Sequence, residues 1–158
     1  MIKVEDFHPQ LESLLPTTFA ILQSSNLIIH ENISSIVLHG SRGISNRFRD
    51  NSDIDLSLVA NIPTKLASQT AKLLPIIFQT TMANWKSNVK LDLAVVFDVK
   101  CCQLRCFQQS IWDDQLCTIG GMDCFGLYKM GNGFNGIVNQ AGVQVQLMYP
   151  CLKIWDRA

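Results

Sequence analysis

The sequence has no long apolar run and no excess of charge of either sign. No stretch approaches the roughly 18 consecutive apolar residues that a membrane-spanning helix needs, and the opening letters MIKVEDFHPQ lack the pattern of a secretory signal. Thirteen basic side chains balance thirteen acidic ones, so the chain lacks the broad positive surface with which proteins bind long nucleic acid. We therefore expect a soluble cytoplasmic protein that contacts neither a membrane nor long nucleic acid.

The spacing of a structural zinc site is also missing, although the chain has six cysteines. No two of them have Cys-x-x-Cys spacing with a matching histidine pattern. Cytoplasmic thiols stay reduced, so we expect reduced and mostly buried side chains, with a zinc site or a redox role as the alternative. All six follow residue 100: Cys101, Cys102, Cys106, Cys117, Cys124 and Cys151.

The length and apolar content suit one globular domain. A chain of 158 residues with 47% apolar residues can bury roughly two thirds of its unfolded surface. No repeat, low-complexity tract or linker divides it. We interpret residues 1–158 as a single α/β (α+β) domain, in which a small mixed β-sheet is flanked by helices.

Three segments have the three-and-four spacing of apolar residues that predicts helices. The first covers about residues 7–25, with a kink or break at Pro16. The second covers about residues 61–86, where Pro75 again interrupts the helix. The third covers about residues 99–121 and ends at a Gly-Gly pair.

Other segments have the patterns of strands. Residues 33–40 form a β-branched run closed by glycine, and residues 53–60 and 89–97 alternate polar or small residues with aliphatic ones. Closely spaced Gly and Asn residues separate alternating runs in the tail, residues 125–155, which is typical of one or two hairpins.

Two aspartates open the second predicted strand. Because residues i and i+2 of a strand point to the same face, Asp53 and Asp55 converge, with side chains roughly 7 Å apart. Such like charges repel unless a cation binds between them, and hard oxygen ligands suit Mg²⁺. Asp92, on the polar face of the third strand, is the candidate third ligand. The alternatives are solvated turn residues and an edge-strand surface charge.

The residues around the first predicted strand end suit a phosphate chain. Glycine at Gly40 lets backbone approach a ligand closely, and Ser41 offers a hydroxyl beside free N–H groups. Arg42 adds a guanidinium whose fork matches phosphate oxygens, and Ser52, at the end of the loop, is a fourth candidate. In the alternative interpretation, the glycine ends a strand and Ser41 only caps the following turn.

Together these segments resemble a known family, the nucleotidyltransferases of the DNA polymerase beta superfamily, in particular its small stand-alone members. The family has an apolar strand ending in Gly-Ser, a loop, an Asp-x-Asp followed by aliphatic residues, and a third Asp on a later strand. Here "IVLHGS", "NSDIDLSLV" and "KLDLAVV" supply these parts in that order. The resemblance covers about residues 33–97.

The resemblance implies a nucleotidyltransferase-like fold and assigns roles to five positions. Gly40 and Ser41 hold the triphosphate of ATP or another nucleoside triphosphate. Asp53 and Asp55 bind Mg²⁺ in a two-ion site, for which Mn²⁺ is an alternative. Asp92 completes the site and activates the acceptor hydroxyl, so that attack on the alpha phosphate expels pyrophosphate.

The chain departs from the larger family members in its C-terminal part. Those relatives add helical domains and basic surfaces for nucleic acid, whereas the tail here is short and sparsely charged. We therefore expect a small molecule or a protein as the acceptor. Two alternatives remain: an antitoxin-like or regulatory module that binds a helical partner protein, and a domain that binds nucleotide without turnover.

Overall fold

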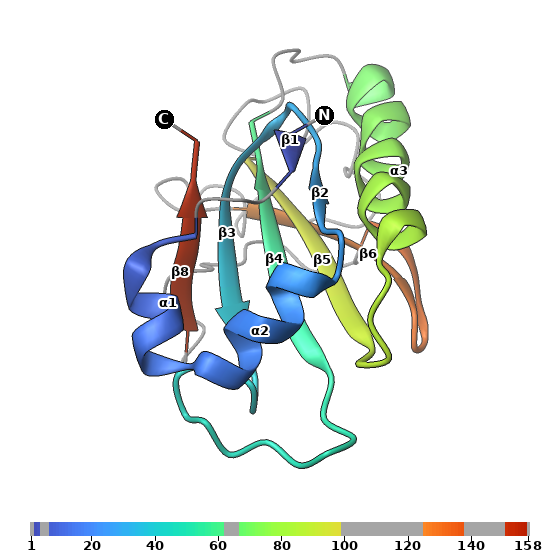
Figure 1. Ribbon diagram of the computed structural model, residues 1–158. Coiled ribbons are helices and arrows are strands. Elements are labelled where there is room, and N and C mark those ends of the chain that lie inside the picture. The colour runs from blue at the N-terminus through green and yellow to red at the C-terminus, as the bar shows by residue number, and fades with distance from the viewer. Residues whose placement is uncertain (1, 4–6, 62–66, 99–124, 138–150, 158) are drawn as a thin grey trace.

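The computed structural model describes residues 2–3, 7–61, 67–98, 125–137 and 151–157 (Figure 1). Within these ranges the chain forms three helices and eight strands. The helices are α1 (Pro9–Leu14), α2 (Pro16–Ser24) and α3 (Ala67–Asn84). The strands are β1 (Ile2–Lys3), β2 (Ile28–Ile29), β3 (Ile33–His39), β4 (Ile54–Ala60), β5 (Leu91–Asp98), β6 (Phe125–Gly131), β7 (Phe134–Ile137) and β8 (Cys151–Asp156).

Six of the strands form one mixed sheet in the order β7-β6-β5-β4-β3-β8. Strands β4 and β5 are parallel, and their connection contains α3. The other neighbouring pairs are antiparallel, while β1 and β2 form a separate small sheet. The fold is therefore α+β with a mixed sheet, as the sequence predicts at this level.

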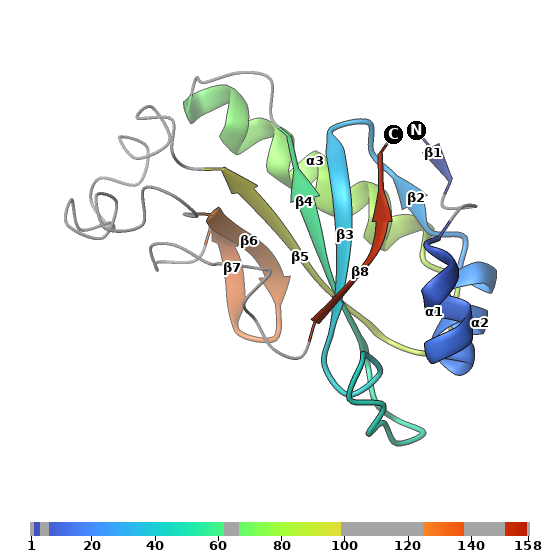
Figure 2. The same cartoon turned by 90° about the vertical axis from the view of Figure 1, so that its left-hand side faces the viewer.

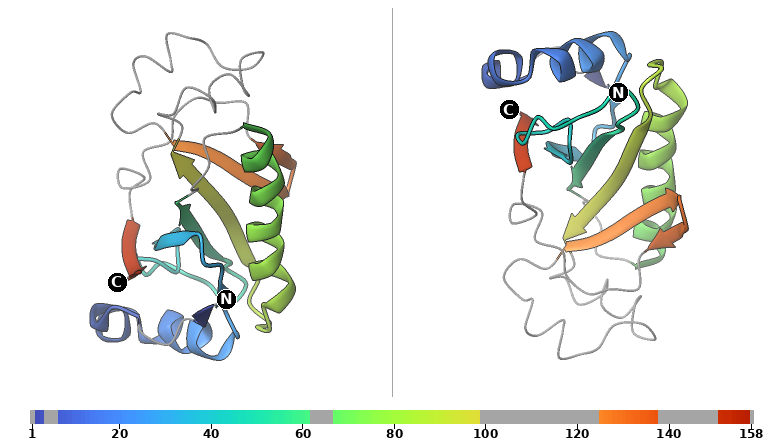
Figure 3. Two further views of the ribbon diagram at one scale, coloured as in Figure 1. Left: turned by 90° about the horizontal axis from the view of Figure 1, so that it is seen from above. Right: turned by 90° about the horizontal axis from the view of Figure 1, so that it is seen from below.

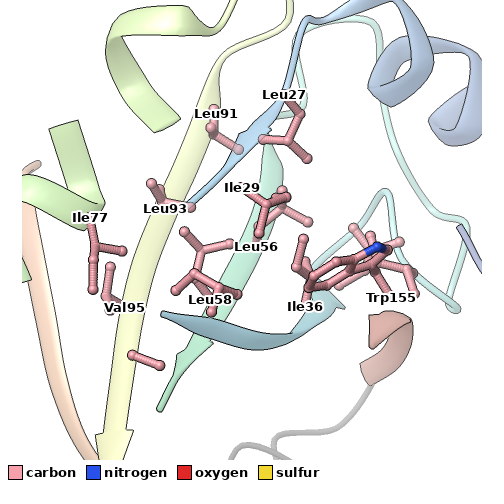
Figure 4. Packing of buried hydrophobic residues seen from close by; sticks show 14 of the residues in the cluster. Leu27, Ile29, Ile36, Leu56, Leu58, Ile77, Leu91, Leu93, Val95 and Trp155 are labelled. Atoms are coloured by element: carbon pink, nitrogen blue, oxygen red, sulfur yellow. The ribbon is translucent and has the colours of Figure 1, made fainter. Parts of the chain in front are cut away.

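All three helices lie on one face of the large sheet (Figures 2 and 3). The apolar residues between the helices and the sheet form one continuous core, part of which Figure 4 shows. Alternate residues of the two central strands belong to it: Ile54, Leu56 and Leu58 from β4, and Leu91, Leu93 and Val95 from β5. The residues between them face the other side of the sheet, because side chains of a strand alternate.

The two prolines in predicted helices have different outcomes. The break at Pro16 is confirmed, since α1 ends at Leu14 and α2 begins at Pro16, where a missing N–H removes no helical hydrogen bond. The interruption at Pro75 is wrong, because α3 continues through it. Leu74 and Ile77, on either side of Pro75, are both fully buried in the core, and this packing offsets the hydrogen bond that proline removes.

The three predicted strands that form β3, β4 and β5 are confirmed to within two residues at each end. In the tail, β6 and β7 form the predicted hairpin, but β8 pairs with β3 at the far side of the sheet. Arg157 contributes to this placement, because its guanidinium donates to the carbonyl oxygens of Ile33 at 2.9 Å and His30 at 3.0 Å.

Some predictions fall outside the described residues. They include the helix over residues 99–121 and five of the six cysteines. The sixth, Cys151, begins β8 and is partly buried. In the part of the chain that the structure describes, no helix is long and apolar enough to cross a membrane.

Candidate functional site

The parallel pairing of β4 and β5 sets Asp55 directly beside Asp92. Neighbouring strands lie about 4.8 Å apart, so the two carboxyl groups meet, and they share a side-chain hydrogen bond. Such a bond between two carboxyl groups requires that one of them holds a proton. The sequence places these aspartates 37 positions apart, and strand register brings them together.

The pKa of Asp55 is raised from 3.8 to about 7. Burial is the largest cause, followed by the hydrogen bond with Asp92 and by Coulomb repulsion from Asp92 and Asp53, while Lys129 lowers the pKa in part. Near neutral pH, Asp55 therefore exchanges between its acid and carboxylate forms. A strongly shifted pKa caused by burial and a like charge in a cavity is typical of functional sites.

Lys129 of β6 is the charged residue of this site that the sequence analysis missed. Its Nζ lies 2.6 Å from Oδ1 of Asp92, and both side chains are largely enclosed. The ammonium also lies 4.9 Å from the ring centroid of Phe134 on β7. Leu127 and Lys129 share one face of β6, and Tyr128 lies on the other, but nothing local in the sequence tells which strand lies next to β6.

Gly40 packs against Asp55, which explains why glycine occupies this position. Its φ of +74° lies in the left-handed region, and a Cβ atom here would collide with Oδ2 of Asp55. Gly40 therefore has a structural reason, the close approach of its backbone to a carboxylate of the protein itself, and its predicted contact with phosphate stays a prediction. The following turn closes with a hydrogen bond of 3.0 Å from the Gly43 N–H to the Gly40 carbonyl, and Ser41 lies within this turn, half-buried.

Arg42 and Ser52 organise the loop between β3 and β4. Arg42 is only 3% exposed. Its Nε donates to the Ser52 carbonyl at 2.7 Å, and its Nη2 donates to the carbonyls of Arg49 at 3.1 Å and Asp50 at 3.3 Å. The Ser52 hydroxyl accepts a hydrogen bond of 2.8 Å from the Arg49 N–H. Both side chains thus have structural partners, and their predicted contacts with phosphate stay a prediction.

Asp53 lies immediately before β4 and is partly buried. It is close enough to Asp55 to raise the pKa of that residue, but it does not line the cavity that contains Asp55 and Asp92. Among the described residues, no three His, Cys, Asp or Glu side chains are grouped so that they could hold a metal ion. The structure thus joins two of the three predicted carboxylates and leaves the third beside them.

The acidic pair lies in a cavity of about 310 Å³ on the sheet face opposite α1, α2 and α3. Asp55, Asp92 and Lys129 form its charged part, and Ala94, Leu127 and Phe134 form an apolar wall. His39 and Ser57 complete the polar lining, with His39 Nε2 and Ser57 Oγ 3.0 Å apart. The far wall of this pocket comes from the β6–β7 hairpin, which the sequence alone does not place beside β5.

Asp55 and Asp92 are the two acidic side chains of this cavity that could bind a divalent cation. Asp55 and Asp92 repel each other once both are ionised, and the hydrogen bond between them is then lost. A cation of the Mg²⁺ type, which binds through one or two carboxylates and keeps several waters, would relieve that repulsion.

The chain matches no protein-family model, and no curated protein or solved structure was found to match it, so its function is inferred from this site.

Proposed function

We propose that the protein is a divalent-metal-dependent nucleotidyltransferase. It transfers a nucleoside monophosphate from ATP or another nucleoside triphosphate to a hydroxyl group and releases pyrophosphate. The observation that carries the proposal is the Asp55–Asp92 pair at the start of two parallel strands, with the Gly40 turn packed against it. This juxtaposition is the one that the resemblance of the sequence to the polymerase beta superfamily requires.

Each part of the site has a distinct task in this proposal. Asp55 and Asp92, with Asp53 beside them, would hold Mg²⁺ or Mn²⁺. The metal supplies charge neutralisation at the phosphates and a lower pKa for the attacking hydroxyl. The turn at Gly40 and Ser41 would receive the triphosphate, and the next residue, Arg42, donates to carbonyls of the loop before β4. Catalysis would then rest on positioning and on electrostatic stabilisation.

The dimensions of the cavity support a compact acceptor. A volume of about 310 Å³ lies at the lower end of the range for small-molecule sites, so it admits one small molecule or one side chain of a protein. A long polynucleotide would need many phosphate contacts, and the chain carries equal numbers of basic and acidic residues. We therefore propose a hydroxyl of a small molecule or of a protein as the acceptor.

The test uses the full chain, Mg²⁺ or Mn²⁺, and nucleoside triphosphates labelled at the alpha phosphate. Small-molecule and protein fractions from the source cell serve as acceptors, and both transferred label and released pyrophosphate are measured. We expect Asp55→Asn and Asp92→Asn each to lower the rate by about 100-fold or more, as loss of a group that stabilises charge in a transition state does. Glu12→Gln, on the exposed side of α1, is the control that should keep the wild-type rate.

Equal labelling by the wild type and the Asp55→Asn variant would exclude the proposed chemistry. Absence of label with every fraction would instead favour the second candidate, a regulatory module that binds a helical partner protein. Met130 and Phe134 favour that candidate, since they are 38% and 39% exposed on the β6–β7 hairpin. Stable copurification with such a partner would support it.

A further inference from the structure

Lys129 faces the side of the sheet opposite α3, while its neighbour in the chain, Tyr128, faces the core. Tyr128 is 8% exposed and packs edge-on against Phe78 of α3, with ring centroids 5.7 Å apart. Because side chains of a strand alternate, Lys129 points to the opposite face, into the cavity. Ala94 lines the same cavity, and its small side chain leaves room for the lysine to reach Asp92.

The ion pair between Lys129 and Asp92 is short and largely enclosed. Nζ lies 2.6 Å from Oδ1, and the two side chains are 17% and 24% exposed. Enclosed charges are screened less by solvent and salt than surface charges. Lys129 therefore neutralises much of the negative charge that would otherwise attract a cation to the acidic pair.

A divalent cation and the lysine ammonium cannot both approach Asp92 closely without strong repulsion. The long and flexible lysine stem allows the ammonium to move within the cavity. The ring centroid of Phe134 lies 4.9 Å from Nζ of Lys129, and the face of an aromatic ring attracts a cation. A lysine ammonium in this position has three N–H donors, which suit phosphate oxygens.

We propose that Lys129 exchanges partners: its ammonium neutralises Asp92 in the cation-free protein, and it leaves Asp92 for a phosphate group of the nucleotide when a divalent cation binds the acidic pair. This inference rests on the proposed function. It assigns to the β6–β7 hairpin a role in ligand binding. It also predicts that loss of the ammonium affects the cation and the nucleotide in opposite directions.

Two titrations with the full chain test the exchange. In the first, Mn²⁺ alone is titrated and free Mn²⁺ is measured by electron paramagnetic resonance. In the second, a non-hydrolysable ATP analogue is titrated at saturating Mn²⁺. The variants are Lys129→Met and, as a polar replacement should the first fail to fold, Lys129→Gln. Lys129→Arg keeps the charge, and Lys153→Met removes an exposed lysine of β8 that pairs with Asp156.

We expect Lys129→Met to bind Mn²⁺ about fivefold more tightly, because a competing charge is gone, and to bind the analogue about fivefold more weakly, because a phosphate partner is gone. Lys153→Met should stay within about twofold of the wild type in both titrations, since it keeps the charge beside Asp92. Lys129→Arg, which also keeps a charge there, should lie closer to the wild type than Lys129→Met does. A lysine that only stabilises the local structure would weaken both affinities when replaced, and that result would overturn the inference.

The remaining outcomes are equally decisive. Unchanged or weaker Mn²⁺ binding by Lys129→Met, with clear binding by the wild type, overturns the exchange and leaves the proposed function intact. Tighter Mn²⁺ binding with unchanged affinity for the analogue also overturns it, since the phosphate contact is then missing. If neither protein binds Mn²⁺, the proposed function and the inference fail together.

Discussion

The two faces of β4 and β5 have opposite effects on the stability of the fold. On the helix-covered face, Leu56, Leu58 and Leu93 are at most 2% exposed and belong to one core. On the other face the same strands carry Asp55 and Asp92, which line a cavity and repel each other once both are ionised. One face therefore stabilises the fold, and the other holds groups whose proximity opposes folding. The site therefore depends on the apolar residues that alternate with Asp55 and Asp92 along the same strands, because their burial stabilises the fold.

The difference between the faces can be stated as free energy. Burial of one large aliphatic side chain contributes roughly 1.5–3 kcal/mol, and the helix-covered face has many such side chains. Among the described residues, the buried apolar cluster of the opposite face contains Val37 and Val96. Substitutions on the two faces should therefore change the free energy of unfolding by different amounts, and a substitution of Asp55 should change it with the opposite sign.

The largest expected effect comes from the helix-covered face. Leu58 of β4 is fully buried, so Leu58→Ala should lower the free energy of unfolding by about 3 kcal/mol, through lost burial and the cavity that remains. Its neighbour Ser57 faces the other side, and Ser57→Ala should cost about 1 kcal/mol, for its hydrogen bond with His39. Urea denaturation measures both values. Equal losses would contradict the assigned difference between the faces.

Gly40→Ala should have the next largest effect. A non-glycine residue at φ +74° costs about 1–3 kcal/mol, and the new Cβ would also displace the Asp55 carboxylate. Gly133→Ala is the matched control, because Gly133 has φ +90° but open space where a Cβ would lie. The excess loss of Gly40→Ala over this control, again from urea denaturation, measures the contact with Asp55. Equal losses of stability for the two variants would show that the contact between Gly40 and Asp55 does not restrict the residue at position 40.

Arg42→Met should cost about 2 kcal/mol in the absence of nucleotide, because charge-assisted hydrogen bonds to three loop carbonyls are lost. The control is Arg47→Met, at an exposed position of the same loop, which should leave stability nearly unchanged. Thermal unfolding without ligand and hydrogen exchange of the loop amides measure the effect. An Arg42 that served only to bind phosphate would leave the nucleotide-free protein as stable as before.

Asp55→Asn should have the smallest effect on stability, and at alkaline pH it should stabilise the protein, whereas the other substitutions destabilise it. The pKa of Asp55 is about 7 in the folded protein against an ordinary 3.8, so the folded state binds more protons than the unfolded state between these values. The contribution of Asp55 to stability therefore falls as the pH rises through this window. At pH 8 the variant should melt a few degrees above the wild type, and at pH 4 the gain should vanish.

Asp50→Asn, at an exposed position of the loop, is the control for this pH series. It removes a carboxylate outside the acidic pair and should not reproduce the gain at pH 8. A pH-independent difference between Asp55→Asn and the wild type would show that repulsion within the acidic pair does not act on stability.

Much of the fold could be predicted because its signals are local. The alternation in β4 and β5 identified which residues face the core, and Pro16 marked the boundary between α1 and α2. Pro75 misled, because its local cost is outweighed by the burial of Leu74 and Ile77 against the sheet. That burial depends on contacts between elements distant in the chain, which no window of sequence contains.

The sequence by itself determined how the residues of β4 and β5 alternate between the two faces of the sheet, because the period of a strand is a property of the local chain. Only the tertiary structure decided that Asp92 lies beside Asp55, that Arg42 binds its own loop and that Lys129 completes the cavity. The physical reason is that strand order and register depend on packing across the whole sheet. Segments far apart in the chain become neighbours only through that packing.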